Sequence, residues 1–112
     1  MRRSAVKVIN IAKEFSVSPA GRVPADGPFN GERFRNDFLA PALNKNDKVV
    51  VVLDGVSGFG SSFLEEAFGG LVRKKIASPE MLGTHLEIQY SDQKLAFYAE
   101  LIHEFINEAR PE

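Results

Sequence analysis

The chain has 112 residues, 44% of them apolar and 26% charged, which is typical of one globular domain with a single hydrophobic core. With 14 Lys and Arg against 15 Asp and Glu, the net charge of -1 excludes a global basic field for binding nucleic acid or anionic membranes. The absence of cysteine excludes disulfides, thiol catalysis, and zinc–thiolate or iron–sulfur sites.

No segment has the ~20 consecutive apolar residues of a membrane-spanning helix. The apolar residues that follow Arg2-Arg3 are interrupted by Lys7, Asn10 and Lys13. A signal peptide needs an unbroken apolar run of about 7–15 residues, so none is predicted. We therefore expect a cytoplasmic protein in which residues 1–112 form one domain.

The first predicted strand covers residues 5–11, because AVKVINI is rich in β-branched residues. The phase of its apolar positions slips by one residue, which predicts either a bulge or burial of both faces. Phe15 and Val17 extend this strand or form a second short one. Three prolines and three glycines then predict a loop over residues 18–31.

A helix over residues 32–44 follows, with large apolar side chains on one face. Pro41 has no N–H to donate, so it predicts a kink or break near residues 37–41. The clearest strand of the chain covers residues 48–54. Its four consecutive valines show no alternation with polar residues, which indicates a central strand covered on both faces.

Residues 54–60 form a glycine-rich loop after this strand, and residues 62–74 form the next helix. Ser62 and Glu65 have the spacing of a capping box, in which both side chains accept hydrogen bonds from backbone N–H groups at the helix start. Gly69-Gly70 costs ~1 kcal/mol per glycine relative to alanine, which predicts close packing of another backbone there. The apolar stripe of this helix is Phe63, Leu64, Ala67, Phe68, Leu71 and Val72.

Residues 77–83 predict a loop, and the alternating HLEIQY at residues 85–90 predicts a strand near the edge of the sheet. Residues 92–109 form the last helix, with Ser91 or Asp92 as its cap. The order β-α-β-α-β-α predicts an α/β fold, in which helical crossovers connect the strands of a mostly parallel sheet.

The candidate site is the loop that leaves the central strand and opens the next helix. Backbone N–H groups and the helix dipole favour an anion there, and open α/β sheets bind ligands at this edge. The loop lacks the third glycine of a dinucleotide fingerprint, the Gly-Lys-Ser/Thr of a phosphate-binding loop and the Gly-x-Ser-x-Gly of an esterase. The residues that it offers are Ser57, Gly58, Gly60, Ser61 and Ser62.

No catalytic residue, metal site or cofactor is predicted. No pattern places His85 or His103 near Ser61, and two histidines without i,i+4 spacing make a poor metal site. Glu65 and Glu66 complement the dipole in the first turn of their helix. We favour this role over acid–base catalysis, because no partner acid is positioned by spacing.

Residues 49–72 (VVVVLDGVSGFGSSFLEEAFGGLV) resemble the STAS domains, named for sulfate transporters and anti-sigma-factor antagonists. They are more similar still to a bacterial STAS-like family of unknown function, and the resemblance covers about residues 5–91. It rests on GERFR at 31–35, LDGV at 53–56, SSFLEEAFGGL at 61–71, and the pairs Gly21-Arg22 and Asp26-Gly27.

The resemblance implies a mixed sheet with helices, and a regulatory protein–protein interaction module rather than an enzyme. In antagonist-type STAS proteins, a serine at the start of the helix is phosphorylated by a partner kinase that doubles as an anti-sigma factor. Ser61 matches that serine and Ser62 the next position. Gly60 replaces the family's aspartate, and Phe63 replaces its glycine.

Three functions stay open at this point. The first is a non-enzymatic regulatory module for a protein partner such as an ATP-binding kinase of the anti-sigma type. Its binding surface would be the loop 57–62 with the helix face of Glu65 and Glu66, and Ser61 would be an exposed phosphoserine switch. The alternative is a small-ligand module that holds a nucleotide or another anion at the same loop. The third is a domain that works only within a larger complex.

Overall fold

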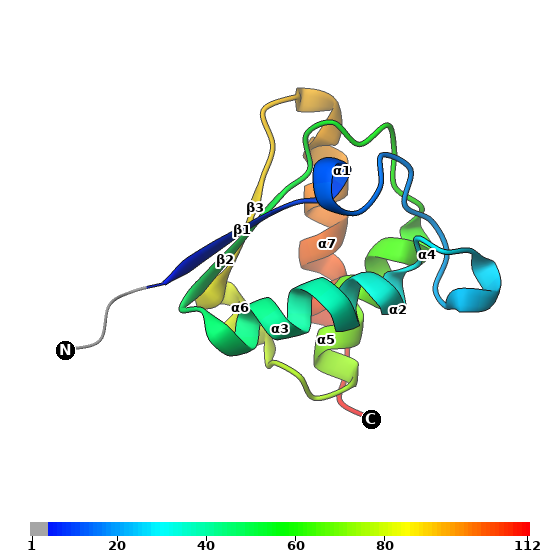
Figure 1. Cartoon of the computed structure of the whole chain (residues 1–112). Helices are drawn as coiled ribbons and strands as arrows, with labels where there is room; N and C mark the ends of the chain where they lie inside the picture. Colours follow the sequence, from blue (N-terminus) through cyan, green and yellow to red (C-terminus); the bar gives the residue numbers. More distant parts are fainter. Residues whose placement is uncertain (1–4) are drawn as a thin grey trace.

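The computed structural model describes residues 5–112 and contains a three-stranded parallel sheet (Figure 1). The strands are β1 (Val6–Asn10), β2 (Lys48–Val52) and β3 (Leu86–Gln89), in the order β1-β2-β3. The predictions of a central strand near 48–54 and of an α/β fold are confirmed. Both strand pairs are parallel, so the described sheet is not mixed.

Helices connect the strands, and each of the two connections contains a long helix interrupted by a π-helical turn. Between β1 and β2 lie α1 (Ile11–Glu14), the 3-10 turn η1 (Pro24–Asp26), and a continuous helix of α2 (Gly31–Phe34), the π turn η2 (Arg35–Leu39) and α3 (Ala40–Lys45). Between β2 and β3 lie a continuous helix of α4 (Ser61–Leu64), the π turn η3 (Glu65–Gly69) and α5 (Gly70–Arg73), and then α6 (Pro79–His85). The 3-10 turn η4 (Gln93–Leu95) leads into α7 (Ala96–Glu108).

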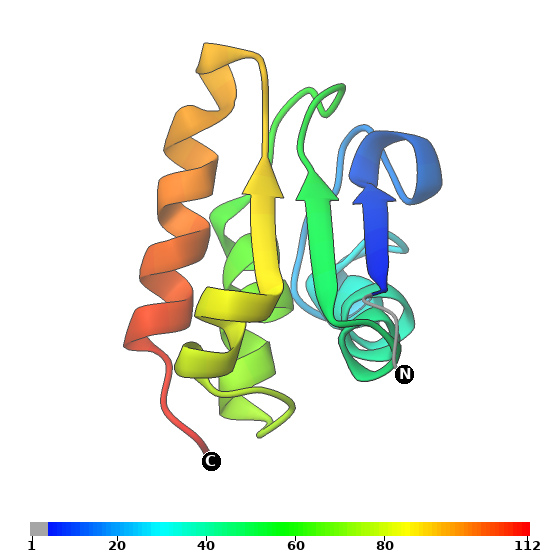
Figure 2. The same cartoon turned by 90° about the vertical axis from the view of Figure 1, so that its left-hand side faces the viewer.

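The long helices lie on one face of the sheet, and among residues 5–112 no helix crosses the other face (Figure 2). Val49 and Val51 point to the covered face and are fully buried. On the open face Val6 is 59% exposed and Val8 52% exposed. The expectation that the central strand is covered on both faces by helices is therefore wrong. Val50, on the same open face, is nevertheless only 7% exposed.

The predicted disturbance near residues 37–41 is present, although the helix does not break. The π turn η2 (Arg35–Leu39) lies directly before Pro41, which is in the first turn of α3. Pro41 cannot donate a backbone hydrogen bond, so the regular helical pattern has to change in this region. A second π turn, η3, lies in the facing helix, where proline plays no part.

Two segments differ from the sequence-based expectation. Residues 77–83 were expected as a loop, but α6 begins within them, because Ser78 accepts a hydrogen bond from the Met81 N–H at 3.1 Å and Pro79 occupies the first turn. His85 ends α6 instead of opening a strand. Phe15 and Val17 form no strand, and α1 follows β1 directly.

The hydrophobic core lies between the sheet and the helices. The predicted stripe of the second long helix is confirmed, because Phe63, Leu64, Phe68 and Leu71 are fully buried. Gly69 approaches the Phe105 carbonyl of α7, as the glycine pair predicted. Aromatic side chains fill the space between the two long helices and α1: Phe15, Phe34, Phe38, Phe63 and Phe68.

Candidate functional site

The loop after β2 begins at Asp54, whose carboxylate is fully used inside the domain. It accepts hydrogen bonds from the Ser91 N–H at 2.9 Å and the Ser91 hydroxyl at 3.1 Å. The Asp92 N–H is a further donor at 3.3 Å. The Ser91 N–H is the main reason why the pKa of Asp54 lies below its ordinary value. Asp54 therefore joins this loop to the segment that precedes α7.

Ser57 is also committed to the fold. Its N–H and its hydroxyl both donate to the Val17 carbonyl, at 2.8 and 2.9 Å. The Ser18 hydroxyl lies 3.2 Å away. Ser57 thus attaches the loop to the segment that follows α1, and among the predicted site residues it has a structural role.

Ser61 and Ser62 are exposed, and neither hydroxyl has a hydrogen-bond partner among residues 5–112. Gly60 is the cap residue of α4, Ser61 is its first residue, and no side chain caps the helix. The predicted capping box of Ser62 and Glu65 is therefore wrong. The helix begins at Ser61, so Ser62 lies inside its first turn and is not the cap residue, and the Glu65 carboxylate binds two arginines.

These arginines come from opposite sides of Glu65. Arg22 Nη1 donates to Glu65 Oε1 and Arg73 Nη1 donates to Glu65 Oε2, both at 2.6 Å. Burial raises the pKa of Glu65, but the hydrogen bonds from Arg73 and Arg22 outweigh it, and the net result is a lowered pKa. The hydrogen bond between Arg73 and Glu65 also raises the pKa of Arg73.

Glu66 is paired more deeply. Arg35, which is only 3% exposed, donates through Nη1 to Glu66 Oε2 at 2.6 Å and to the Glu66 carbonyl at 2.8 Å. Arg22 and Arg73 lie 3.6 Å from the other oxygen of Glu66. The helix face of Glu65 and Glu66, predicted as part of the binding surface, is half-buried and neutralised by arginines.

Glycines allow this close approach of the two long helices. A Cβ on Gly31 would lie 2.7 Å from the Phe63 carbonyl oxygen and 3.0 Å from the Ala67 nitrogen. Gly70 lies against the Arg35 guanidinium. The segments that carry the family resemblance, GERFR and SSFLEEAFGGL, thus pack against each other, and most of their residues are used in that packing.

The structure packs Tyr98 of α7 against this loop, and sequence reasoning missed its exposed neighbour Phe97. Phe59 is buried, and its ring centroid lies 5.2 Å from that of Tyr98. The ring centroids of Tyr98 and Phe97 are 5.9 Å apart. Phe97 is 62% exposed, the highest value among the large apolar side chains described. It lies off the apolar stripe of α7, and an off-stripe phenylalanine is the signal that could have indicated it.

The model of the STAS-like domain of unknown function (DUF4325) matches residues 30–92. The chain belongs to this STAS-like family. No curated protein and no solved structure matches it. The matched part of the STAS-like domain includes β2, β3, both long helices and the loop that carries Ser61, while β1 and the Gly21-Arg22 pair lie before it. No helix among residues 5–112 is long and apolar enough to cross a membrane.

Proposed function

We propose that this STAS-like domain is a non-enzymatic module that binds a protein partner through the Ser61 surface, formed by residues 57–62 and Phe97. The exposed ring of Phe97 is the observation that carries the proposal. Aromatic side chains are enriched at protein interfaces and supply much of their binding energy. Tyr98, the next residue of α7, packs against Phe59 of the loop, and we infer that a partner contacts the Phe97 ring and the loop together.

We further propose that Ser61 is a phosphorylation site on this surface, and that the partner is an ATP-binding kinase of the anti-sigma type. Its hydroxyl is exposed at the start of a helix, where the dipole favours negative charge. Glu65 and Glu66 lie one turn later, but Arg22, Arg35 and Arg73 neutralise them. A phosphate on Ser61 would therefore meet little repulsion from its own helix.

Quantitative pull-down from extracts of the native host tests the binding surface. Wild type is compared with Phe97→Ala, Ser61→Asp and the control Ile76→Ala, which removes a 37% exposed side chain in the segment after α5. We expect at least one partner that is retained by Ile76→Ala and lost by both Phe97→Ala and Ser61→Asp. Equal recovery of every protein by all four baits would contradict the proposal.

Mass spectrometry of the protein isolated from the same host tests the switch. We expect phosphate on Ser61. Phosphate on Ser62 alone would contradict the assignment, because both hydroxyls are exposed and only their positions on the helix differ.

A further inference from the structure

Strand β1 has a free backbone edge. The Ala5 carbonyl accepts a hydrogen bond from the Lys48 N–H at 3.1 Å. The backbone N–H and C=O groups of the odd-numbered residues of β1 therefore point toward β2, and those of the even-numbered residues point to the outer edge of the sheet. At the end of the strand, the outward Asn10 N–H donates to Glu14 Oε2 at 2.7 Å. The N–H and C=O groups of Val6 and Val8 are then unpaired within residues 5–112.

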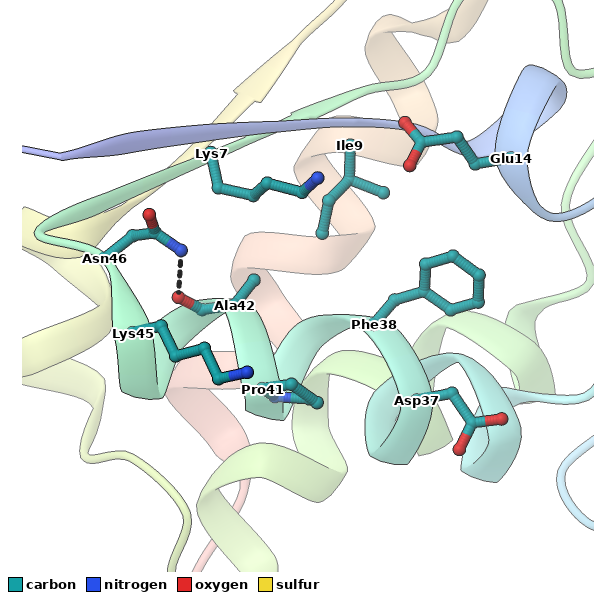
Figure 3. Close-up of a pocket in the computed structure, with 9 residues that line it drawn as sticks. All are labelled: Lys7, Ile9, Glu14, Asp37, Phe38, Pro41, Ala42, Lys45 and Asn46. Atoms are coloured by element: carbon teal, nitrogen blue, oxygen red, sulfur yellow. Dashed lines mark hydrogen bonds between the residues drawn. The ribbon is translucent and has the colours of Figure 1, made fainter.

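A groove of about 370 Å³ lies beside this edge, between β1 and the η2–α3 helix (Figure 3). Its apolar wall is formed by Ile9, which is 1% exposed, together with Phe38 and Ala42. The volume is at the lower end of the ~300–1,000 Å³ of ligand pockets. Alternate side chains of a strand added to β1 would point into this groove, because strand side chains alternate between faces.

The groove has opposite charges at its two ends. Lys7 and Lys45 lie at the end nearer the start of β1, and Glu14 and Asp37 lie at the end nearer α1 (Figure 3). Neither lysine has an ion-pair partner in the described part of the chain. Among residues 5–112, the ion-pair contact of Asp37 is a long one, 3.8 Å from its carboxylate to Arg33 Nε. An occupant complementary to this groove carries an acidic group at the lysine end and a basic group at the other end.

We propose that the β1 edge and this groove bind an extended segment of a partner protein that pairs antiparallel to β1. Backbone groups of the segment would bond to Val6 and Val8, and its side chains would supply specificity, which is how sheet edges recognise peptides. Antiparallel pairing is the more stable arrangement per residue. It places the start of the segment at the Glu14 end of the groove and its end at Lys7.

This geometry defines the sequence of the segment. Side chains two residues apart enter the groove, so the pattern is a basic residue, any residue, an apolar residue, any residue, and an acidic residue. The apolar side chain lies over Ile9 and the acidic one beside Lys7. The surface is separate from the Ser61 surface, and the proposal does not depend on the function proposed above.

Selection from a random seven-residue peptide library on the immobilised full chain tests the pattern. We expect a consensus with the order basic–x–apolar–x–acidic. A synthetic consensus peptide should bind wild type in fluorescence anisotropy at least tenfold more tightly than the same peptide with reversed sequence. No consensus, or equal binding of the reversed peptide, would overturn the proposal.

Variants of the edge separate pairing from unspecific contact. Val8→Pro removes an N–H that the fold does not use, and proline is tolerated where a strand's N–H faces solvent. We expect it to weaken peptide binding at least tenfold, as should N-methylation of the peptide. The Lys7→Glu variant should bind a peptide whose last charged residue is basic more tightly than it binds the consensus peptide, in which that residue is acidic. The variants Ser61→Ala and Phe97→Ala should bind the consensus peptide like wild type.

Two further outcomes would overturn the proposal. One is unchanged binding of the unmodified and the N-methylated peptide by a folded Val8→Pro variant. The other is a concentration-dependent dimer in light scattering that Val8→Pro abolishes, because the occupant of the edge would then be a second copy of this chain.

Discussion

Arg35 and Glu66 form an ion pair between the two π turns, with Arg35 Nη1 2.6 Å from Glu66 Oε2 and only 4% of the arginine side chain exposed. The pair joins the two segments that carry the family resemblance. The Arg35 guanidinium also lies against Gly70. The ion pair and this glycine are therefore part of the same contact between the two helices, and residues of both segments take part in it.

The first prediction concerns this pair. Arg35→Met keeps an apolar stem but leaves the Glu66 carboxylate, 13% exposed, without its closest cation. Removing one partner of a buried pair typically costs 3–5 kcal/mol. We expect a loss near the lower limit, about 3 kcal/mol in urea unfolding, because Arg22 and Arg73 remain 3.6 Å from Glu66.

The matched control is Lys48→Met, which removes the exposed Lys48–Glu87 pair of 2.7 Å on the open face of the sheet. Exposed ion pairs stabilise a fold only weakly, so this variant should lose less stability than Arg35→Met. Equal unfolding free energies of the two variants would contradict a special role for Arg35.

The second prediction concerns pH. The pKa of Glu65 in the folded protein lies below its ordinary value of 4.5, so the unfolded chain binds protons more readily at this residue. The stabilisation by Glu65 is fully present above pH 4.5 and is lost as the pH falls through the lower, folded-state pKa. Glu65→Gln should therefore flatten the acid side of the stability profile, measured by urea unfolding between neutral pH and pH 3.

Glu87 serves as the control for this measurement, because its pKa is also lowered, chiefly by the hydrogen bond from Lys48, but the residue is half-exposed on the sheet. Screening by solvent makes such a pair weak. A Glu87→Gln variant that changes the acid profile as much as Glu65→Gln would count against the arginine cluster as the cause.

The third prediction compares two glycines. Gly31→Ala places a Cβ 2.7 Å from the Phe63 carbonyl oxygen, where backbone cannot easily move, so we expect a loss of about 1–3 kcal/mol. Gly83→Ala, within α6, meets nothing within 4 Å and should gain up to ~1 kcal/mol from helix propensity. Chemical unfolding of both variants checks the opposite signs, and a neutral Gly31→Ala would mean that the helices are not held at this distance.

Features that depend on local sequence patterns could be predicted, and features that depend on contacts between distant residues could not. The valine run of β2 and the stripe of Phe63, Phe68 and Leu71 are local patterns, and the structure confirms both. The capping box of Ser62 and Glu65 is also local. It fails because α4 begins at Ser61 with Gly60 as its cap residue, and because Glu65 binds Arg22, which lies 43 residues away in sequence.

Other misses have a similar cause. The helix α6 is short, and its Ser78-Pro79 start is a recognisable signal that its weak apolar periodicity hid. The off-stripe position of Phe97 is visible in the sequence, but its exposure depends on whether another helix or strand covers that face of α7. The free edge of β1 required the strand order.

The last prediction separates a protein-binding surface from an anion site at the same loop. The start of α4 has no side-chain cap, and the cation Arg22 is engaged by Glu65 at 2.6 Å. An exposed helix dipole alone contributes ~0.3–1 kcal/mol, whereas a millimolar dissociation constant requires ~4 kcal/mol. Phosphate, ATP and GTP at millimolar concentration should therefore leave the melting temperature unchanged, relative to sodium chloride of equal ionic strength. A saturable rise with any of them, lost in Ser61→Asp, would favour the small-ligand module instead.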